Sequence, residues 1–267
     1  MLKTNNIFSI RKMIRLGLNG TVCVLATILC SCGDNKPQQI VDNAIEVHGG
    51  KAYRSFHLEF DFRNRHYTAS RNGGVFTYTR EFTDSTGVIK DVLNNDGLTR
   101  FRNGSILDIT DERKHAFTKS VNSVIYFALL PYGLNDKAVN KQWVKEVTIK
   151  NEPYDMVRVT FDQQNGGEDH SDIFLYWFHQ QKHTMDYFAY KYETDGGGLR
   201  FREAINPRRI GGILWQDYIN YKPADESIPL EDLESMFISG SLERLSEVKM
   251  ENAKVTEYRP ELVKTIR

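Results

Sequence analysis

The sequence has little cysteine and no excess of either charge. Three of its 267 residues are cysteines, and all three lie at or before position 32. The rest of the chain therefore has no thiol for a disulfide, a nucleophile or a zinc site. Basic and acidic residues each number 35, so the formal net charge is zero. This balance gives no support for phosphate contacts, and no nucleic-acid partner is expected.

The sequence does contain enough apolar residues to build a core. Hydrophobic residues make up 40% of the chain, and 13 tyrosines and 15 phenylalanines are among its aromatic residues. Disorder is therefore excluded as a description of the whole chain. No linker or fixed-period repeat divides it. We expect a single domain over residues 40–267.

The first 31 residues have the parts of an export signal. They carry four basic residues, Lys3, Arg11, Lys12 and Arg15, and no acid, and an apolar run follows from Thr21 to Cys30. This run is shorter than the roughly 20 residues that a spanning helix needs. A cleaved signal peptide over residues 1–31 is the prediction, and an uncleaved anchor helix is the alternative.

The signal ends at Leu29-Cys30-Ser31-Cys32. This sequence resembles the bacterial lipobox, in which a cysteine that follows a small residue is acylated and becomes the mature N-terminus. Cys32 fits that position, so the resemblance implies a lipid-anchored protein of the bacterial cell envelope, held in a membrane and facing the periplasm or the cell surface. Residues 32–39 are polar and are expected to form a short tether. Removal of the signal leaves a net charge of −4.

The spacing of apolar residues predicts helix, strands, helix and strands. Helices are expected over residues 39–48 and 111–130, the second ending at Pro131. Turn residues separate the runs that favour β-structure. The strands are expected at 56–69, 75–83, 88–94, 98–102, 105–109, 142–150, 154–163, 171–180, 183–193, 199–205 and 209–221. Residues 229–233 are expected to form a helical turn.

This order of elements resembles that of the LolA/LolB-like proteins, the bacterial lipoprotein-carrier superfamily. The resemblance implies an α+β fold in which a strongly curved antiparallel sheet forms an incomplete barrel and helices cover its concave, apolar face. The chain also resembles an uncharacterised family of secreted lipoproteins over most of residues 40–222. The motifs that carry this second resemblance are residues 44–50, 78–82, 169–172, 176–177, 186–190, 200–204 and 216–218.

Strand 171–180 is apolar on both faces and is expected to be central in a covered sheet. Its aromatic residues, together with those of the next strand, form either a packed core or the lining of a cavity. If these rings line a cavity, we predict a ligand site that combines them with nearby arginine side chains. Its residues are Phe174, Tyr176, Phe178, Tyr187, Tyr190, Arg200 and Arg202.

Four arginines follow this region. Arg200 and Arg202 share a strand face, and Arg208 and Arg209 come just after Asn206-Pro207. If the strand turns back there, up to four guanidinium groups gather in one place, which suits a carboxylate, a phosphate or a sulfate. An outward-facing network of ion pairs is the alternative.

Histidines offer weaker candidates. Asp169, His170 and Asp172, with His179 and His183, have the residue types of a metal site, but such side chains ordinarily bond to local turn backbone. His48 is either a general base or a helix-end or core histidine. Because no nucleophile motif accompanies it, we predict no catalytic residue, no metal and no cofactor.

The expected function is non-enzymatic binding of a hydrophobic or amphiphilic small molecule by a lipid-anchored envelope protein. A carbohydrate-binding or envelope-assembly lipoprotein that acts through a surface of tyrosine and arginine is the alternative. An enzyme is the third possibility, and it requires the histidines or arginines to converge in a pocket.

Overall fold

The computed structural model describes residues 35–162, 172–192 and 197–261. The predicted signal peptide, Cys32 and His170 lie outside the described residues. In the described part of the chain, no helix combines the length and apolar character that a membrane span requires.

Three α-helices and fourteen strands are present in the described residues. The helices are α1 (Lys36–His48), α2 (Asp111–Ala128) and α3 (Leu233–Ile238), with short 3-10 turns at Gly50–Arg54, Tyr132–Asn135 and Leu230–Asp232. The strands are β1 (Ser55–Phe62), β2 (Arg65–Asn72), β3 (Val75–Asp84), β4 (Gly87–Asn94), β5 (Gly97–Arg102), β6 (Ser105–Ile106), β7 (Val139–Ile149), β8 (Glu152–Phe161), β9 (Ile173–His179), β10 (Met185–Tyr192), β11 (Gly198–Ile210), β12 (Ile213–Lys222), β13 (Glu243–Val248) and β14 (Glu251–Thr256).

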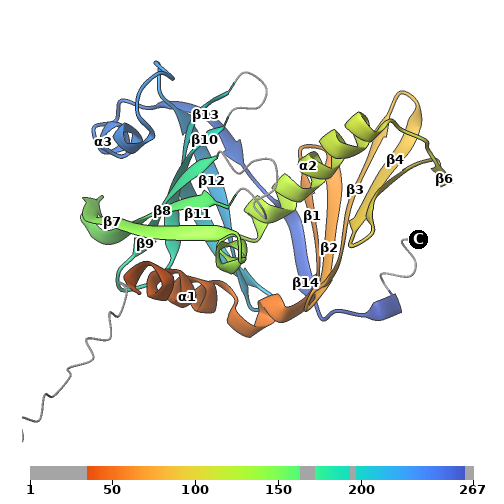
Figure 1. The fold of residues 1–267 in the computed structure, drawn as a ribbon, viewed down its shortest axis with the longest axis horizontal. Coiled ribbons are helices and arrows are strands. Elements are labelled where there is room, and N and C mark those ends of the chain that lie inside the picture. Colours follow the sequence, from red (N-terminus) through yellow and green to blue (C-terminus); the bar gives the residue numbers. More distant parts are fainter. Residues whose placement is uncertain (1–34, 163–171, 193–196, 262–267) are drawn as a thin grey trace, which may run out of the picture. The chain divides into compact units, whose positions relative to one another are not determined.

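These strands form two antiparallel sheets of seven strands each (Figure 1). Sheet A has the order β14-β1-β2-β3-β4-β5-β6, and sheet B has the order β13-β12-β11-β10-β9-β8-β7. Strands β13 and β14 are consecutive in sequence, but they pair with β12 and β1 instead of with each other. The predicted antiparallel α+β fold is confirmed, and the sheets do not close into a barrel. The strands that we expected in a single curved sheet form two sheets, and the chain passes between them twice, through α2 and between β13 and β14.

Helix α2 packs against both sheets. One stripe of its side chains, Val121, Ile125 and Leu129, joins the core of sheet A. Phe127 and the following Leu130 join the core on one face of sheet B. The i, i+4 spacing of the first stripe aligns it along one side of the helix, which the sequence pattern predicted.

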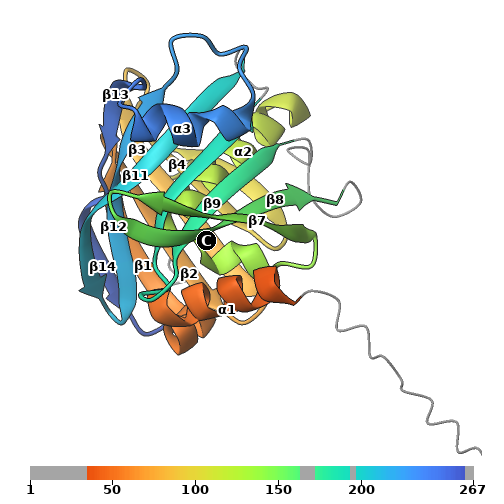
Figure 2. The ribbon, with the colours of Figure 1, turned by 90° about the vertical axis from the view of Figure 1, so that its left-hand side faces the viewer.

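Sheet B is covered on both faces. Phe174, Tyr176 and Phe178 of β9 point toward α1 and the end of α2, whereas Leu175 and Trp177 point toward α3. Figure 2 shows α1 and α3 against different parts of this sheet. The two-faced strand predicted at 171–180 is therefore confirmed, and its alternation is the ordinary period of two of a β-strand.

One expected strand is two strands. The sequence pattern predicted a continuous strand over 56–69, but β1 ends at Phe62 and β2 begins at Arg65. Arg63 and Asn64 form the turn with positive φ angles of 50° and 59°. Such a turn usually contains Gly or Asn-Gly, and an arginine in its first position gave no turn signal.

Two further boundaries differ from the expectation. Helix α1 begins at Lys36, so residues 36–39, which we assigned to the tether, are helical. Pro37 at the start of α1 fits this helix because proline is favoured at the first helical position. Strand β11 runs through Asn206-Pro207 to Ile210, where we expected a break between two strands. The proline is accommodated at a register shift between Ile205 and Arg208, and the chain turns later, at Gly211-Gly212.

Candidate functional site

The strongest candidate site is a group of four aromatic rings and one guanidinium on the α2-facing side of sheet B. We call it the aromatic–arginine cluster: Phe127, Phe174, Phe188, Tyr190 and Arg202. The strand register assembles it, because Tyr190 is paired with Phe174 on one side and Phe188 is paired with Arg202 on the other. Cross-strand neighbours lie on the same face of a sheet. Phe127, near the end of α2, packs against this face.

The rings of the cluster are in mutual contact. The centroid of Phe127 lies 5.9 Å from that of Phe188, 5.5 Å from that of Tyr190 and 6.2 Å from that of Phe174. Phe174 and Tyr190 are stacked with centroids 5.5 Å apart. These separations fall within the usual range for attractive aromatic pairs.

The guanidinium of Arg202 lies against this wall of rings. Its Cζ atom is 4.8 Å from the ring centroid of Phe127 and 5.3 Å from the centroids of Phe188 and Tyr190. Its Nη2 atom donates a hydrogen bond of 2.9 Å to the hydroxyl of Tyr190. Stacking on aromatic faces holds a guanidinium in place without cancelling its charge.

Within the described residues, no carboxylate pairs with Arg202, and its buried Nε–H has no hydrogen-bond partner. The neighbouring Glu203 accepts from Lys150 and Tyr221, and Asp217 of β12 accepts from Arg208. Burial raises the pKa of Tyr218, and the positive charge of Arg202 acts in the opposite direction. Among the described residues, the positive charge of the cluster therefore has no carboxylate partner beside its apolar rings.

The cluster lies at the edge of a core. Phe188 is fully buried and Phe174 is 5% exposed, whereas Phe127, Tyr190 and Arg202 are half-buried. Phe127, Tyr190 and Arg202 are thus partly exposed at the surface, whereas Phe174 and Phe188 belong to the packed interior. Chemically, this arrangement suits a molecule with an anionic group and an apolar portion.

The predicted site residues do not all meet here. Phe174, Tyr190 and Arg202 belong to the cluster, and Tyr176 and Phe178 lie deeper in the same core, fully buried. Tyr187 is on the opposite face of sheet B, where it contacts Phe201 and Phe237. Arg200 lies on the cluster's face but is paired with Glu226 at 3.0 Å and donates to the hydroxyl of Tyr192.

The gathering of four arginines, which depended on a reversal of the chain after Arg202, does not occur. Because β11 continues past Asn206-Pro207, Arg202 and Arg208 are six residues apart on one strand, a separation of about 20 Å. Arg208 pairs with Asp217 at 3.1 Å, and Arg209 donates to the backbone carbonyl of Val47. For Arg200 and Arg208, the structure shows the individual ion pairs of the alternative interpretation.

The histidines described do not converge. His179 is fully buried, its Nδ1 accepts from the backbone N–H groups of Gln181 and Lys182, and its Nε2 contacts Glu152 at 2.9 Å. This is the local turn bonding that the sequence favours over metal binding. His183 lies in that turn with a φ angle of 55°. No group of three possible metal ligands occurs among the described residues.

His48 is a core histidine at the end of α1. Its Nε2 accepts a hydrogen bond of 3.0 Å from the backbone N–H of Met185, which joins α1 to the start of β10. Burial, together with the charge of Arg209, lowers the pKa of His48 to about 3. The residue is therefore neutral near pH 7 and serves as a hydrogen-bond acceptor between two elements.

Two features of the structure were missed in the sequence. Phe127 was counted only as part of the predicted helix, and its aromatic ring near the helix end was the available signal.

The ion cluster of Arg80, Asp91 and Arg100 in sheet A was also missed. Asp91 is fully buried and accepts from Arg80 at 2.7 Å and from Arg100 at 2.6 Å. The sequence did contain a signal for this cluster, because strand alternation assigns these charged residues to core positions.

Comparison with known proteins gives a family and several solved structures that this chain resembles. A LolA superfamily protein from Nitrosomonas europaea has a TM-score of 0.45 and 13% identity, with 85% of this chain and 96% of that chain covered. A DUF1329 family protein from Desulfovibrio piger has a TM-score of 0.42 and 9% identity, with 82% and 92% covered. The Mycobacterium tuberculosis lipoprotein LppX has a TM-score of 0.27 and 11% identity, with 61% and 91% covered.

Among curated proteins, no significant match was found. Residues 20–250 match a family of unknown function, DUF6503. This match covers most of the chain and confirms the prediction of an uncharacterised family. The chain therefore belongs to the DUF6503 family of unknown function.

Proposed function

We propose that this protein is a lipid-anchored protein of the cell envelope that binds an anionic amphiphile at the aromatic–arginine cluster. The observation that carries the proposal is the guanidinium of Arg202, which lies against three aromatic rings and has no carboxylate partner among the described residues. A half-buried cation without a counter-ion is costly to keep, and an anionic ligand offsets that cost.

In this proposal the two parts of the ligand have separate partners. The anionic group, a carboxylate or phosphate, accepts charge-assisted hydrogen bonds from the guanidinium of Arg202. The apolar chain lies along the half-buried rings of Phe127 and Tyr190. Arginine remains charged at every physiological pH, so binding is not expected to depend on its titration.

The test is binding of a fluorescent long-chain fatty acid to the full chain and to its Arg202→Gln variant. A hydrogen bond to a charged group contributes about 1.5–3 kcal/mol, so the variant should bind the fatty acid roughly 10- to 100-fold more weakly. The corresponding fatty alcohol has no charge, and its affinity should change little. Arg158→Gln is the matched control, because Arg158 is on the opposite face of the same sheet and pairs with Glu231.

Two results would contradict the proposal. One is the absence of binding of either probe to the unaltered chain. The other is an equal loss of fatty-acid affinity in the Arg202 and Arg158 variants, which would indicate a general effect of charge. Melting temperatures of both variants establish that the comparison is made between folded proteins.

The alternative of a carbohydrate-binding surface is less well supported. Sugar recognition through stacking needs exposed rings, whereas Tyr176, Tyr187 and Tyr218 are at most 5% exposed. Tyr190 is half-buried and its hydroxyl is bonded to Arg202. The described tyrosines of sheet B therefore favour an internal apolar contact over an open sugar platform.

A further inference from the structure

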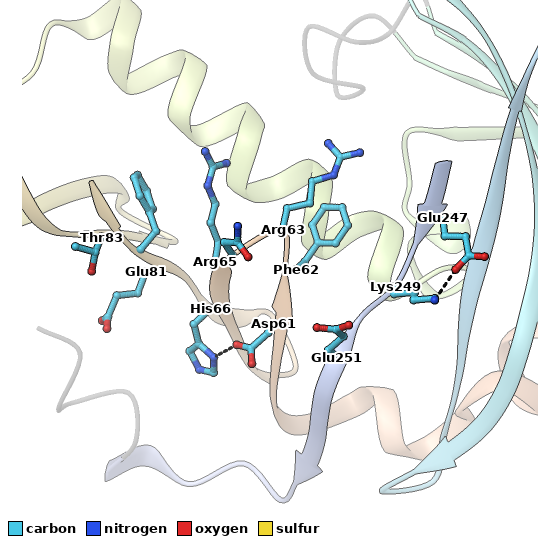
Figure 3. Close-up of a pocket in the computed structure, with 12 residues that line it drawn as sticks. Asp61, Phe62, Arg63, Arg65, His66, Glu81, Thr83, Glu247, Lys249 and Glu251 are labelled. Carbon is cyan, nitrogen blue, oxygen red and sulfur yellow. Dashed lines mark hydrogen bonds and ion pairs between the residues drawn. The ribbon is translucent and has the colours of Figure 1, made fainter. Parts of the chain in front are cut away.

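The groove at the tip of the β1–β2 hairpin is polar, but it does not bring opposite charges together (Figure 3). Its volume is about 790 Å³. The strand register places Arg65 opposite Phe62, on the face of sheet A that packs against α2, and Asp61 opposite His66, on the other face. Figure 3 shows that the arginine side chains extend away from Asp61 and Glu251. One small ligand therefore cannot contact both groups of charges, and we assign none to this groove.

A more informative surface lies at β7, the last strand of sheet B, which pairs with β8. The register shifts between Trp143 and Lys145, so Val144 is the extra residue of a bulge. Val144 is 38% exposed, and the neighbouring Trp143 is half-buried. Two adjacent apolar side chains are therefore accessible on this strand.

The indole of Trp143 is held in a fixed orientation next to the start of α1. Its Nε1–H donates a hydrogen bond of 2.7 Å to Asp155, and the Nζ atom of Lys36 lies 3.9 Å from its ring centroid. Lys36 also pairs with Asp155 at 3.0 Å and with Glu146 at 3.2 Å. A ring with an apolar body and a hydrogen-bonded polar end is typical of the boundary between a membrane and water.

The length of the chain before α1 determines what lies near Trp143. Lys36 is the first residue of α1, and three residues separate it from Cys32, the predicted site of the lipid. An extended chain advances at most about 3.6 Å per residue, so the Cα atoms of Cys32 and Lys36 can be at most about 14 Å apart. A lipid on Cys32 therefore brings the first turn of α1, and Trp143 beside it, close to the bilayer (Figure 2).

We propose that Trp143 and Val144 form the surface through which the anchored protein contacts the membrane. The inference depends on the proposed lipid anchor and adds the face of the domain that meets the bilayer. Both side chains enter the headgroup region, where tryptophan is enriched. Because Lys36 and Lys145 are already paired with carboxylates, this contact does not require anionic lipids.

The experiment measures quenching of tryptophan fluorescence by phosphatidylcholine vesicles that carry a doxyl group near the glycerol end of the acyl chain. The lipid-modified protein is isolated from cells that express the full chain and is reconstituted into these vesicles. The chain has three tryptophans, of which Trp177 and Trp215 are at most 1% exposed. We expect the doxyl lipid to quench Trp143, so the Trp143→Phe variant should lose this quenching.

Two changes of valine to aspartate provide a matched pair. Val144→Asp places a charge at the proposed contact and should reduce the quenching of Trp143, because a charged side chain is costly to move toward the hydrocarbon region. Val88→Asp, near the start of β4 in sheet A, makes the same change at a position that is 43% exposed. Its tryptophan fluorescence should be quenched like that of the unaltered chain.

Flotation of the same vesicles separates this inference from the proposed function. Protein that floats with the vesicles while Trp143 stays unquenched retains the anchor and overturns the proposed contact. Protein that does not float contradicts both. Shielding of Trp143 from acrylamide in detergent, before vesicles are added, would assign this face to a second copy of the chain and would also overturn the proposal. Trp143→Phe and Val144→Asp should leave fatty-acid binding at the aromatic–arginine cluster unchanged.

Discussion

His48 shows at the scale of one residue how burial makes a fold sensitive to pH. The pKa of its imidazole is about 3 in the folded protein, compared with about 6.5 in an unfolded chain. The unfolded state therefore binds more protons between these values. The contribution of His48 to the free energy of unfolding should be constant above about pH 6.5 and should fall by up to about 1.4 kcal/mol per pH unit as the pH decreases toward 3.

Urea unfolding at a series of pH values measures this contribution. The His48→Gln variant has no titrating group at the position, so its free energy of unfolding should decrease less steeply between pH 6 and pH 4. His115→Gln, on the exposed face of α2, removes an imidazole elsewhere and serves as the comparison. Equal slopes for His48→Gln and the unaltered chain would show that other groups carry the acid sensitivity.

At the scale of elements, the Arg80–Asp91–Arg100 cluster connects three strands and a helix. The buried carboxylate of Asp91 on β4 accepts from Arg80 on β3 and from Arg100 on β5. Arg80 also donates to Ser120 of α2 at 2.6 Å. Asp91→Asn should lower the free energy of unfolding by about 3–5 kcal/mol, because it leaves two arginines without their counter-ion in a buried position.

Chemical denaturation of the variant measures this loss. Asp96→Asn, in the exposed turn between β4 and β5, changes the same functional group and should cost less than about 0.5 kcal/mol. If Asp91→Asn also costs less than about 1 kcal/mol, the arginines have found other partners. The cluster would then not be what holds α2 against sheet A.

At the scale of the whole molecule, we predict that the chain is attached to a membrane through Cys32. Cys32→Ser should abolish incorporation of radiolabelled palmitate and leave the protein unprocessed or soluble. Two acyl chains or more are needed for stable anchoring, at about 0.8 kcal/mol per buried CH₂ group, so loss of the modification should release the protein. Cys23→Ser and Cys30→Ser are the matched controls, and both should be labelled normally. Persistent labelling of Cys32→Ser would assign the lipid to another residue.

The sequence alone predicted the local elements well, because periodicity and turn chemistry are local properties. The alternation of Phe174, Leu175 and Tyr176 correctly predicted a strand covered on both faces, and Pro131 correctly marked the end of the second helix. The sequence pattern gave wrong strand boundaries where a residue adopts a backbone conformation that its residue type usually avoids. Arg63 forms a turn without a glycine, and Pro207 is tolerated inside a long strand at a register shift.

The candidate site could be predicted only in part. The sequence grouped Arg202 with Phe174 and Tyr190 as candidate ligand residues, but the register of β9, β10 and β11 in the structure is what puts the three side chains on one face of sheet B. The spacing of turns and apolar residues also predicted antiparallel strands and helices, and the resemblance of short motifs predicted an uncharacterised family. What only the tertiary structure decided was which charges remain without partners. Arg200 and Arg202 are alike in sequence, yet Arg200 meets Glu226 while Arg202 meets Phe127 of α2, because long-range packing of elements far apart in the chain chooses each neighbour.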